Sequence, residues 1–334
     1  MPISIITALV EFAAFLALTT VFIAACIIYY YNMRTKWEYP EDDFQWRFPD
    51  DDITTVKHNV LLDQHVHTKF RGGNLSMRQN IRWHLANGFN AMVLTEHNCI
   101  QPAAEVEAIA KEFAGKIVVL QGMEWTTERI HLNFIGVTSW SDPVPPRPTD
   151  LEIQRAIRAA KSQGAIIVVN HPSSQQKKAP DHPSFENLAN WGVDYIEVAG
   201  QGTFETEAAK LCKKGETAAF GSITGTDIHF PIPANCWTAL NAPSFTREGI
   251  MAELRAKRTE AIYSEAGTPD FTTRLIPEKY KKMELFIEIG KVFSTTTRSQ
   301  LHIKWQRIAT LLLIMIGFFV VVEVFSWAIS LLLL

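Results

Sequence analysis

The stretch VLLDQHVHTKF, residues 60–70, decides the fold, because a short apolar run ends in two histidines one residue apart. Successive side chains of a strand point to opposite faces, so His65 and His67 project together while Val66 points away. Two neutral imidazoles held in this way form half of a metal site. So short a pattern also arises by chance, so the remaining ligands have to come from elsewhere in the chain.

Seven short apolar runs recur along the middle of the chain, and segments with helical patterning separate several of them. Near-continuous apolar strands that alternate with amphipathic helices predict a parallel sheet, either open and doubly wound or closed into a barrel. The expected strands are LLDQH (61–65), AMVLT (91–95), IVVLQG (117–122), LNFIG (132–136), AIIVVN (165–170), YIEVA (195–199) and GSITGT (221–226). Helices are expected at residues 76–86, 151–163, 203–214 and 247–260.

Polar residues gather at the carboxyl ends of these runs, where barrels build their active sites, and this favours a barrel. Glu124 and Asp227 accompany six of the ten histidines, which is far more than a core needs. The six are His65, His67, His97, His131, His171 and His229. We interpret the other four, His58, His84, His182 and His302, as surface or structural residues.

The donor types predict divalent metal ions, because mixed sets of histidine and carboxylate suit zinc, manganese or iron. The four cysteines show no C-x-x-C pair and no disulfide-like cluster, so neither a thiolate site nor a disulfide framework is expected. A net charge of −3 over 334 residues argues against a nucleic-acid binder.

Both ends of the chain are apolar over more than the roughly 20 residues that span a bilayer, and this predicts two transmembrane helices. The runs are Ile3–Tyr31 and Ile308–Leu334. No Lys or Arg precedes the first run, which is longer than the apolar part of a signal peptide, so anchoring is favoured over secretion.

Basic residues flank both runs on the side of the central segment, which the positive-inside rule places in the cytoplasm. The flanking residues are Arg34, Lys36, Lys304 and Arg307. The predicted organisation is a transmembrane helix (1–32), an acidic linker (33–52), the barrel (53–275), a basic juxtamembrane segment (276–307) that forms a helix on the lipid surface, and a second transmembrane helix (308–334).

The order of five motifs resembles the PHP family, the polymerase and histidinol phosphatase superfamily of metal-dependent hydrolases. The motifs are HVH, VLTEHN, GMEWTTERIH, NHP and GTDIH, and GMEWTT followed by His131 is most similar to the branch with bacterial carbaryl hydrolases. The resemblance covers roughly Ile53 to Ser264 and implies a distorted seven-stranded β/α barrel.

The resemblance also implies a ligand set. His65, His67, Glu124 and Asp227 would hold one metal, and Glu124 would bridge to a second metal bound by His131 and His171. His97 and His229 would belong to a third site. Asp227 or His229 would act as the catalytic proton shuttle.

Two positions depart from the pattern that the resemblance implies. Gly72 stands in the loop where members often have an aspartate or histidine, so two metals are expected more firmly than three. Glu96 stands where aspartate is usual, and its longer arm could alter the surroundings of the ligands or reach a metal itself.

The expected activity is hydrolysis by a metal-activated water, without a covalent nucleophile from the protein. A phosphoester is the first expectation, with Lys69, Arg71 and Arg129 as candidates for binding an anionic group. Hydrolysis of a carbamate, ester or amide, and metal binding without turnover, are the alternatives. The substrate would be a small molecule or, given the membrane helices, a lipid-linked one; the sequence leaves the oligomeric state open.

Overall fold

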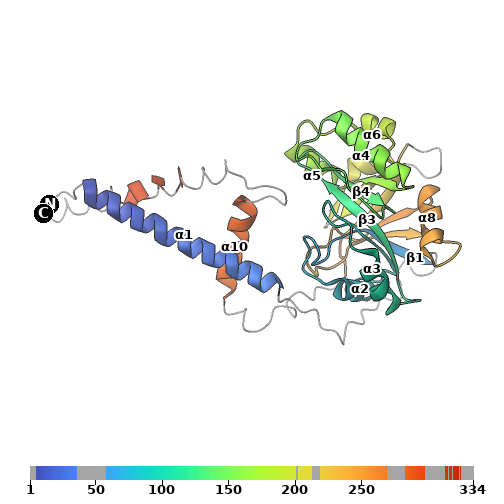
Figure 1. Cartoon of the computed structure of the whole chain (residues 1–334), viewed down its shortest axis with the longest axis horizontal. Coiled ribbons are helices and arrows are strands. Elements are labelled where there is room, and N and C mark those ends of the chain that lie inside the picture. Colours follow the sequence, from blue (N-terminus) through green and yellow to red (C-terminus); the bar gives the residue numbers. More distant parts are fainter. Residues whose placement is uncertain are drawn as a thin grey trace. The chain divides into compact units, whose positions relative to one another are not determined.

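The computed structural model describes residues 5–35, 58–200, 202–212, 219–268 and 283–297, with 313, 314, 316, 317, 319–322 and 324. The chain divides into two compact units (Figure 1). One comprises Met1–Trp37 with Ile276–Leu334, and the other comprises Glu38–Leu275.

The second unit is built around a sheet of ten strands. Along the sheet the order is β10-β9-β1-β2-β3-β4-β5-β6-β7, and β8 pairs with β6. The strands are β1 (Val60–Val66), β2 (Ala91–Leu94), β3 (Val118–Thr126), β4 (His131–Ile135), β5 (Ile166–Val169), β6 (Tyr195–Gly200), β7 (Thr203–Phe204), β8 (Gly221–Thr224), β9 (Cys236–Leu240) and β10 (Glu260–Tyr263).

The sheet curls until its two ends nearly meet, so the unit is a mixed α/β barrel. Beyond β8 the chain reaches β1, where Ile228 forms a parallel bridge with Val66. The amide of Thr224 on β8 also donates to Thr238 Oγ1 on β9 over 2.8 Å. The seven strands expected from the sequence are confirmed as β1 to β6 and β8, whereas β7, β9 and β10 were not expected.

The expectation of a parallel sheet is wrong for part of the barrel. β4 runs antiparallel to both β3 and β5, and β9 runs antiparallel to β1 and β10. For β3 and β4 the reason lies in their connection, which is only Thr127 to Ile130. A parallel pair needs a crossover of a dozen or more residues, whereas so short a link can only close a hairpin.

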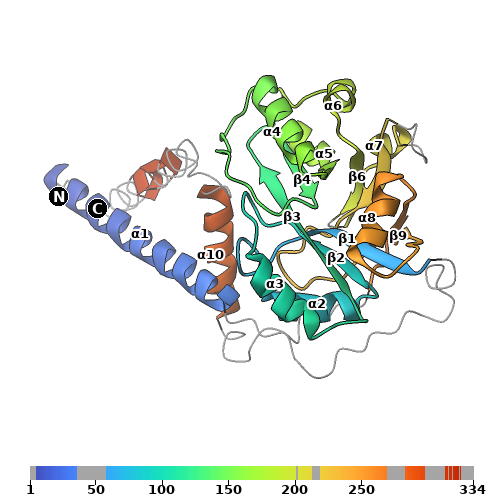
Figure 2. The same cartoon turned by 45° about the vertical axis from the view of Figure 1, so that its right-hand side comes forward.

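Helices pack around the outside of the sheet (Figures 1 and 2). The expected helices at 76–86 and 151–163 are confirmed, and both begin with capping boxes, at Ser76 and Thr149. The helix expected at 203–214 is shorter, because Thr203–Phe204 forms β7, and the one at 247–260 ends at Arg255. The helices are α2 (Met77–Ala86), α3 (Ala103–Lys111), α4 (Asp150–Ser162), α5 (Pro172–Lys178), α6 (Phe185–Trp191), α7 (Thr206–Lys210) and α8 (Arg247–Arg255).

The first unit contains α1 (Ile5–Thr35) and α10 (Glu284–Thr297). The two helices pack closely at Gly290, where a Cβ atom would lie 2.2 Å from the carbonyl oxygen of Cys26. Within α1, Val10–Tyr30 has a mean hydropathy of 2.4 and is long and apolar enough to cross a membrane. A signal sequence near the N-terminus has the same length and apolar character. The second expected span lies largely outside the described residues, as does His302; the described residues between 313 and 324 are helical.

Candidate metal centre

The site begins at the end of β1, where His65 and His67 point into the mouth of the barrel. Pairing of β1 with β2 shifts by one residue between Asp63 and Val66, as at a β-bulge. The Nε2 atoms of His65 and His67 lie 3.3 and 3.0 Å from Asp227 Oδ1. Val66 instead packs in an apolar cluster with Leu61 and Ile228, so the two imidazoles project together as expected.

Glu124 on β3 occupies the centre of the site and is 1 % exposed. Its two carboxylate oxygens lie near imidazole nitrogens on different sides. Oε1 is 3.3 Å from His65 Nε2, 3.0 Å from His131 Nδ1 and 3.5 Å from His171 Nε2. Oε2 is 2.6 Å from His97 Nδ1 and 3.6 Å from His67 Nε2. A carboxylate placed in this way can bridge two cations.

Eight predicted residues thus come together from the ends of β1, β3, β4, β5, β8 and the segment after β2. They form four overlapping groups whose ligand atoms lie within 4.8 Å of one another. The groups are His65, His67 and Glu124; Glu124, His131 and His171; His65, His171 and Asp227; and His67, His97 and His229.

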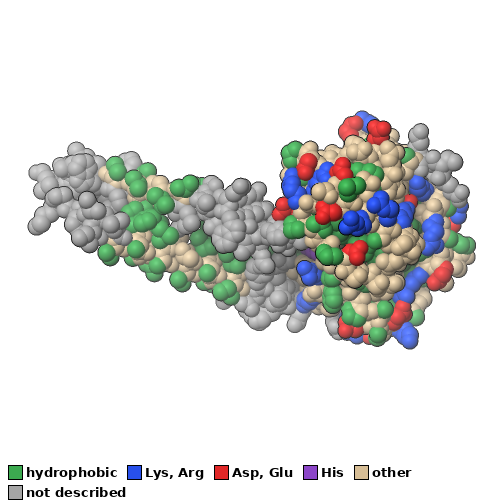
Figure 3. Space-filling view, turned by 45° about the horizontal axis from the view of Figure 1, so that its top comes forward, with side chains coloured by type: hydrophobic (Ala, Val, Ile, Leu, Met, Phe, Trp, Pro, Cys, Tyr) green, Lys and Arg blue, Asp and Glu red, His purple; other side chains and the backbone are tan. Residues whose placement is uncertain are grey.

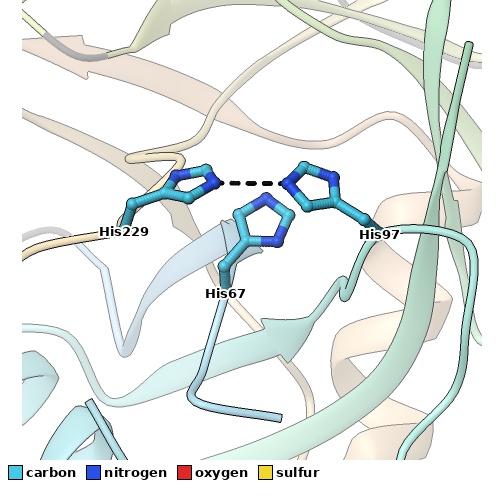
Figure 4. Close-up of side chains that lie close together, drawn as sticks. All are labelled: His67, His97 and His229. Atoms are coloured by element: carbon cyan, nitrogen blue, oxygen red, sulfur yellow. Dashed lines mark hydrogen bonds between the residues drawn. The ribbon is translucent and has the colours of Figure 1, made fainter. Parts of the chain in front are cut away.

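The last of these groups is drawn in Figure 4, where the three rings face one another. His97 Nε2 and His229 Nε2 are 3.2 Å apart. Gly72 lies beside them, with a φ of +107°, and a Cβ atom there would be 2.9 Å from His97 Cδ2. The loop therefore brings backbone, rather than a side chain, to this end of the site.

Unusual backbone conformations cluster at the site. Among the described residues, four non-glycine residues have positive φ, and His171 (29°), Asp227 (48°) and Asn98 (55°) lie at or beside it. Such conformations cost of order 1–3 kcal/mol each and persist where the surrounding contacts enforce them. Asn98 shows how: its amide group donates to the Thr126 carbonyl and accepts from the Thr126 amide.

The electrostatics of the site fit divalent cations. Burial alone would raise the pKa of Glu124, but His131, His65 and His97 hold it well below its usual value. Burial opposes a charge on His65, but the carboxylates of Asp227, Glu197 and Glu124 raise its pKa well above the usual value.

Buried nitrogens at the same place lack hydrogen-bond partners among the described residues. These are His65 Nε2 and both ring nitrogens of His67. Leaving buried polar atoms unsatisfied is costly, and Nε2 atoms that lie 3.0 to 3.6 Å from carboxylate oxygens suit a metal ion bound between them. The donor set therefore fits divalent metal ions, as the sequence predicted.

The remaining candidates occupy different positions. Lys69 and Arg71 are exposed in the loop that carries Gly72. Arg129 ties loops together, since its guanidinium contacts the carbonyls of Pro148 and Asp181 and the carboxylate of Asp150. These contacts favour a structural role for Arg129.

Glu96 does not take part in the four groups. Its carboxylate accepts from the amides of Thr68 and Arg71 and from the side chain of Gln101, over 3.0, 3.2 and 2.7 Å. Burial raises its pKa to about 7. The longer arm therefore fixes the Thr68–Arg71 loop beside the site.

One carboxylate at the site was missed. Glu197 on β6 is 1 % exposed, and its Oε2 lies 2.9 Å from His65 Nδ1. Nothing in the sequence marked this residue, since a glutamate within YIEVA is compatible with ordinary strand alternation. Of the four other histidines, His84 is also fully buried, paired with Asp63 over 3.1 Å.

Comparisons with known proteins find similarity only among solved structures. No family model and no curated protein matches the chain. A two-domain protein from Bacteroides vulgatus, containing a predicted PHP-like metal-dependent phosphoesterase, superimposes with a TM-score of 0.50. The sequences are 23 % identical over 68 % of this chain and 70 % of that one. This likeness shows that the barrel shares its fold with that protein.

Two further solved structures are more distant. A proposed metal-dependent phosphoesterase from Bifidobacterium adolescentis is 14 % identical, with a TM-score of 0.40 over 51 % of this chain and 88 % of that one. An amidohydrolase from Chromobacterium violaceum, with bound sulfate and no metal, is also 14 % identical, with a TM-score of 0.36 over 67 % and 96 %.

Proposed function

We propose that this chain is a metal-dependent hydrolase, most specifically a phosphoesterase. The observation that carries the proposal is the position of Glu124, whose two oxygens face separate sets of imidazoles at the mouth of a PHP-like barrel. His65, His67, Glu124 and Asp227 would hold one cation, and Glu124, His131 and His171 a second. His97 and His229 would supply a third site that lacks a side-chain ligand at Gly72.

Bound divalent cations would supply an activated water and would stabilise the negative charge that grows on the phosphoryl oxygens. The chain's own groups would do the rest. Asp227, which lies 3.0 Å from His67 Nε2 and 3.4 Å from His229 Nδ1, or His229 itself would pass a proton to the leaving group. Lys69 and Arg71, exposed on the neighbouring loop, would attract an anionic substrate.

The test is hydrolysis by the purified full chain in detergent, with a panel of phosphomonoesters, phosphodiesters, carboxylic esters and carbamates. We expect phosphate or phosphomonoester release that stops after chelation and returns with zinc or manganese. Release of an alcohol and an acid without any phosphoester cleavage would assign the site to carbamate or ester hydrolysis instead. Metal uptake with no turnover of any substrate would indicate a binding protein.

Substitution of the ligands tests the site itself. His65→Ala and Asp227→Asn should each lower turnover at least about a hundredfold, because each removes a group from the first site. Circular dichroism should show that both variants stay folded. Turnover at the wild-type level in either folded variant would contradict the assigned first site.

We also propose that α1 anchors the chain in a membrane and that residues 308–334 form a second span. The support is the apolar surface of α1, where Val10, Leu18, Val21 and Ile28 are 61 to 72 % exposed. Figure 3 shows this contrast, with hydrophobic side chains along α1 and acidic and basic ones interspersed over the barrel unit. The basic residues that flank the apolar runs favour a cytoplasmic location of the site. Tethering to the membrane favours a lipid-linked substrate.

A further inference from the structure

Glu197 is a buried carboxylate that belongs to none of the four ligand groups. Its Oε2 lies 2.9 Å from His65 Nδ1 and accepts from Gln64 Nε2 over 2.6 Å, while Oε1 accepts from the amide of His171 over 3.2 Å. Both oxygens of Glu197 thus contact candidate ligands or a neighbour of one: His65, His171 and Gln64. The residue faces the side of His65 that is turned away from Glu124 and Asp227.

Two strand irregularities create this arrangement. The register of β1 shifts between Asp63 and Val66, which lets Gln64 and His65 both reach Glu197. The register of β6 against β8 shifts next to Glu197, between Glu197 and Ala199. Bulges re-aim side chains near active sites, and here two of them meet at one contact.

A chain of three buried amides continues from Glu197 to Glu124. Gln64 Oε1 accepts from Asn133 Nδ2 over 2.9 Å, and Asn133 Oδ1 accepts from Asn170 Nδ2 over 2.9 Å. Asn170 Nδ2 also donates to Glu124 Oε1 over 3.2 Å. All three amides are fully buried, so their orientations are fixed by one another and by the two carboxylates at the ends.

With a metal ion bound, this contact would set the tautomer of His65. Nδ1–H would be donated to Glu197, and the lone pair of Nε2 would be directed at the space shared with Glu124 and Asp227, where Nε2 lies 3.3 Å from an oxygen of each. A carboxylate that accepts from the far nitrogen of a ligand histidine orients the ring and raises its basicity.

We propose that Glu197 is a positioning residue for the first metal site, acting through His65, and that Gln64, Asn133 and Asn170 couple it to Glu124. The inference rests on the proposed metal-dependent function. It requires metal binding, however, and does not require a particular substrate, so the two can fail separately.

Metal affinity of the full chain in detergent is the decisive measurement, by titration of zinc or manganese against a competing chelator. Glu197→Gln keeps the shape but turns one acceptor oxygen into a donor, so a hydrogen bond to His65 or to His171 is lost. We expect affinity at the tightest site to fall about ten- to a hundredfold. Glu253→Gln is the control, because Glu253 is 6 % exposed on α8 and its carboxylate pairs with Arg258.

Three further readouts separate positioning from simple structural support. The Nδ1–H proton of His65 should give a strongly downfield NMR signal in the metal-loaded wild type. In Glu197→Gln this signal should move upfield or disappear, because the acceptor is no longer a carboxylate. The melting temperature of the metal-free protein should be similar in Glu197→Gln and in the wild type. The rise in melting temperature when metal is added should be smaller in Glu197→Gln. Asn133→Ala, which removes the middle of the amide chain without touching a candidate ligand, should weaken metal binding less than Glu197→Gln does.

The outcomes are distinct. A folded Glu197→Gln variant with wild-type metal affinity would overturn the inference; if that variant does not fold, wild-type affinity in folded Asn133→Ala would do the same. Tight metal binding that depends on Glu197, without hydrolysis of any phosphoester, would support the inference and refute the proposed activity.

Discussion

Gly72 determines how much room remains beside His97 and His229. Its φ of +107° is one that side chains rarely adopt, and a Cβ atom would lie 2.9 Å from His97 Cδ2 and 3.7 Å from His229 Nε2. A ligand side chain at this position would therefore need a different loop path. The present path is held by Glu96, through the amides of Thr68 and Arg71.

Gly72→Ala should lower both stability and metal binding at this end of the site. We expect a loss of about 1–3 kcal/mol from backbone strain, and a further loss from displacement of His97. Gly115→Ala is a matched control, because Gly115 also has a positive φ (+77°) but a Cβ atom there would meet nothing within 4 Å. Denaturant unfolding and metal stoichiometry of the two variants provide the comparison, and equal effects on metal binding would contradict the contact with His97.

At the level of single residues, the sequence predicted the ligands better than the groups that hold them. The six histidines, Glu124 and Asp227 were recognisable because they follow apolar runs. Glu197 and the amides of Gln64, Asn133 and Asn170 were not, since the role of each depends on a partner far away in the chain. From sequence alone, a glutamate within a strand is expected to face solvent. Only the structure shows that the bulge beside Glu197 turns this residue toward the site.

At the level of elements, strands were predicted well and their directions less well. The seven apolar runs all form strands, because apolar and β-branched residues suit buried sheet positions. The direction of β4 depended on the length of one connection. β9 and β10 follow a less regular part of the sequence. β9 pairs with β1 beside tertiary contacts of Asn59 with Asn241 and Ala242, and β10 pairs with β9.

The capping box of α2 offers a test at this level, because α2 begins just after the loop that carries Gly72. Ser76 Oγ accepts from the amide of Gln79, and the Gln79 side chain accepts from the amide of Ser76. Ser76→Ala should lower the free energy of unfolding by about 1 kcal/mol. Ser162→Ala, in the last turn of α4, should change it by only a few tenths of a kcal/mol. Urea unfolding measures both, and equal losses would mean that the box contributes nothing.

At the level of the whole molecule, the aromatic partners of α1 follow one another along the helix in reverse sequence order. Phe22 packs on Phe286 of α10, with ring centroids 5.8 Å apart, whereas Phe12 and Phe15 pack on Phe319 at 4.9 and 5.7 Å. The later partner in sequence thus meets the earlier part of α1. The proposed hairpin of two membrane helices would produce this order.

Anchoring by the unit that contains α1 predicts whether the protein is found in the membrane fraction or in the soluble fraction. The full chain should stay in the membrane fraction after an alkaline wash, because Val10–Tyr30 alone can span the bilayer. The compact unit Glu38–Leu275 should appear in the soluble fraction and bind the same number of metal ions, since every candidate ligand lies within it. An intact mass that includes residues 1–37 would exclude removal of α1 as a signal sequence. Release of the full chain by the wash would instead mean that α1 does not span the membrane. The argument for a lipid-linked substrate would then lose its support.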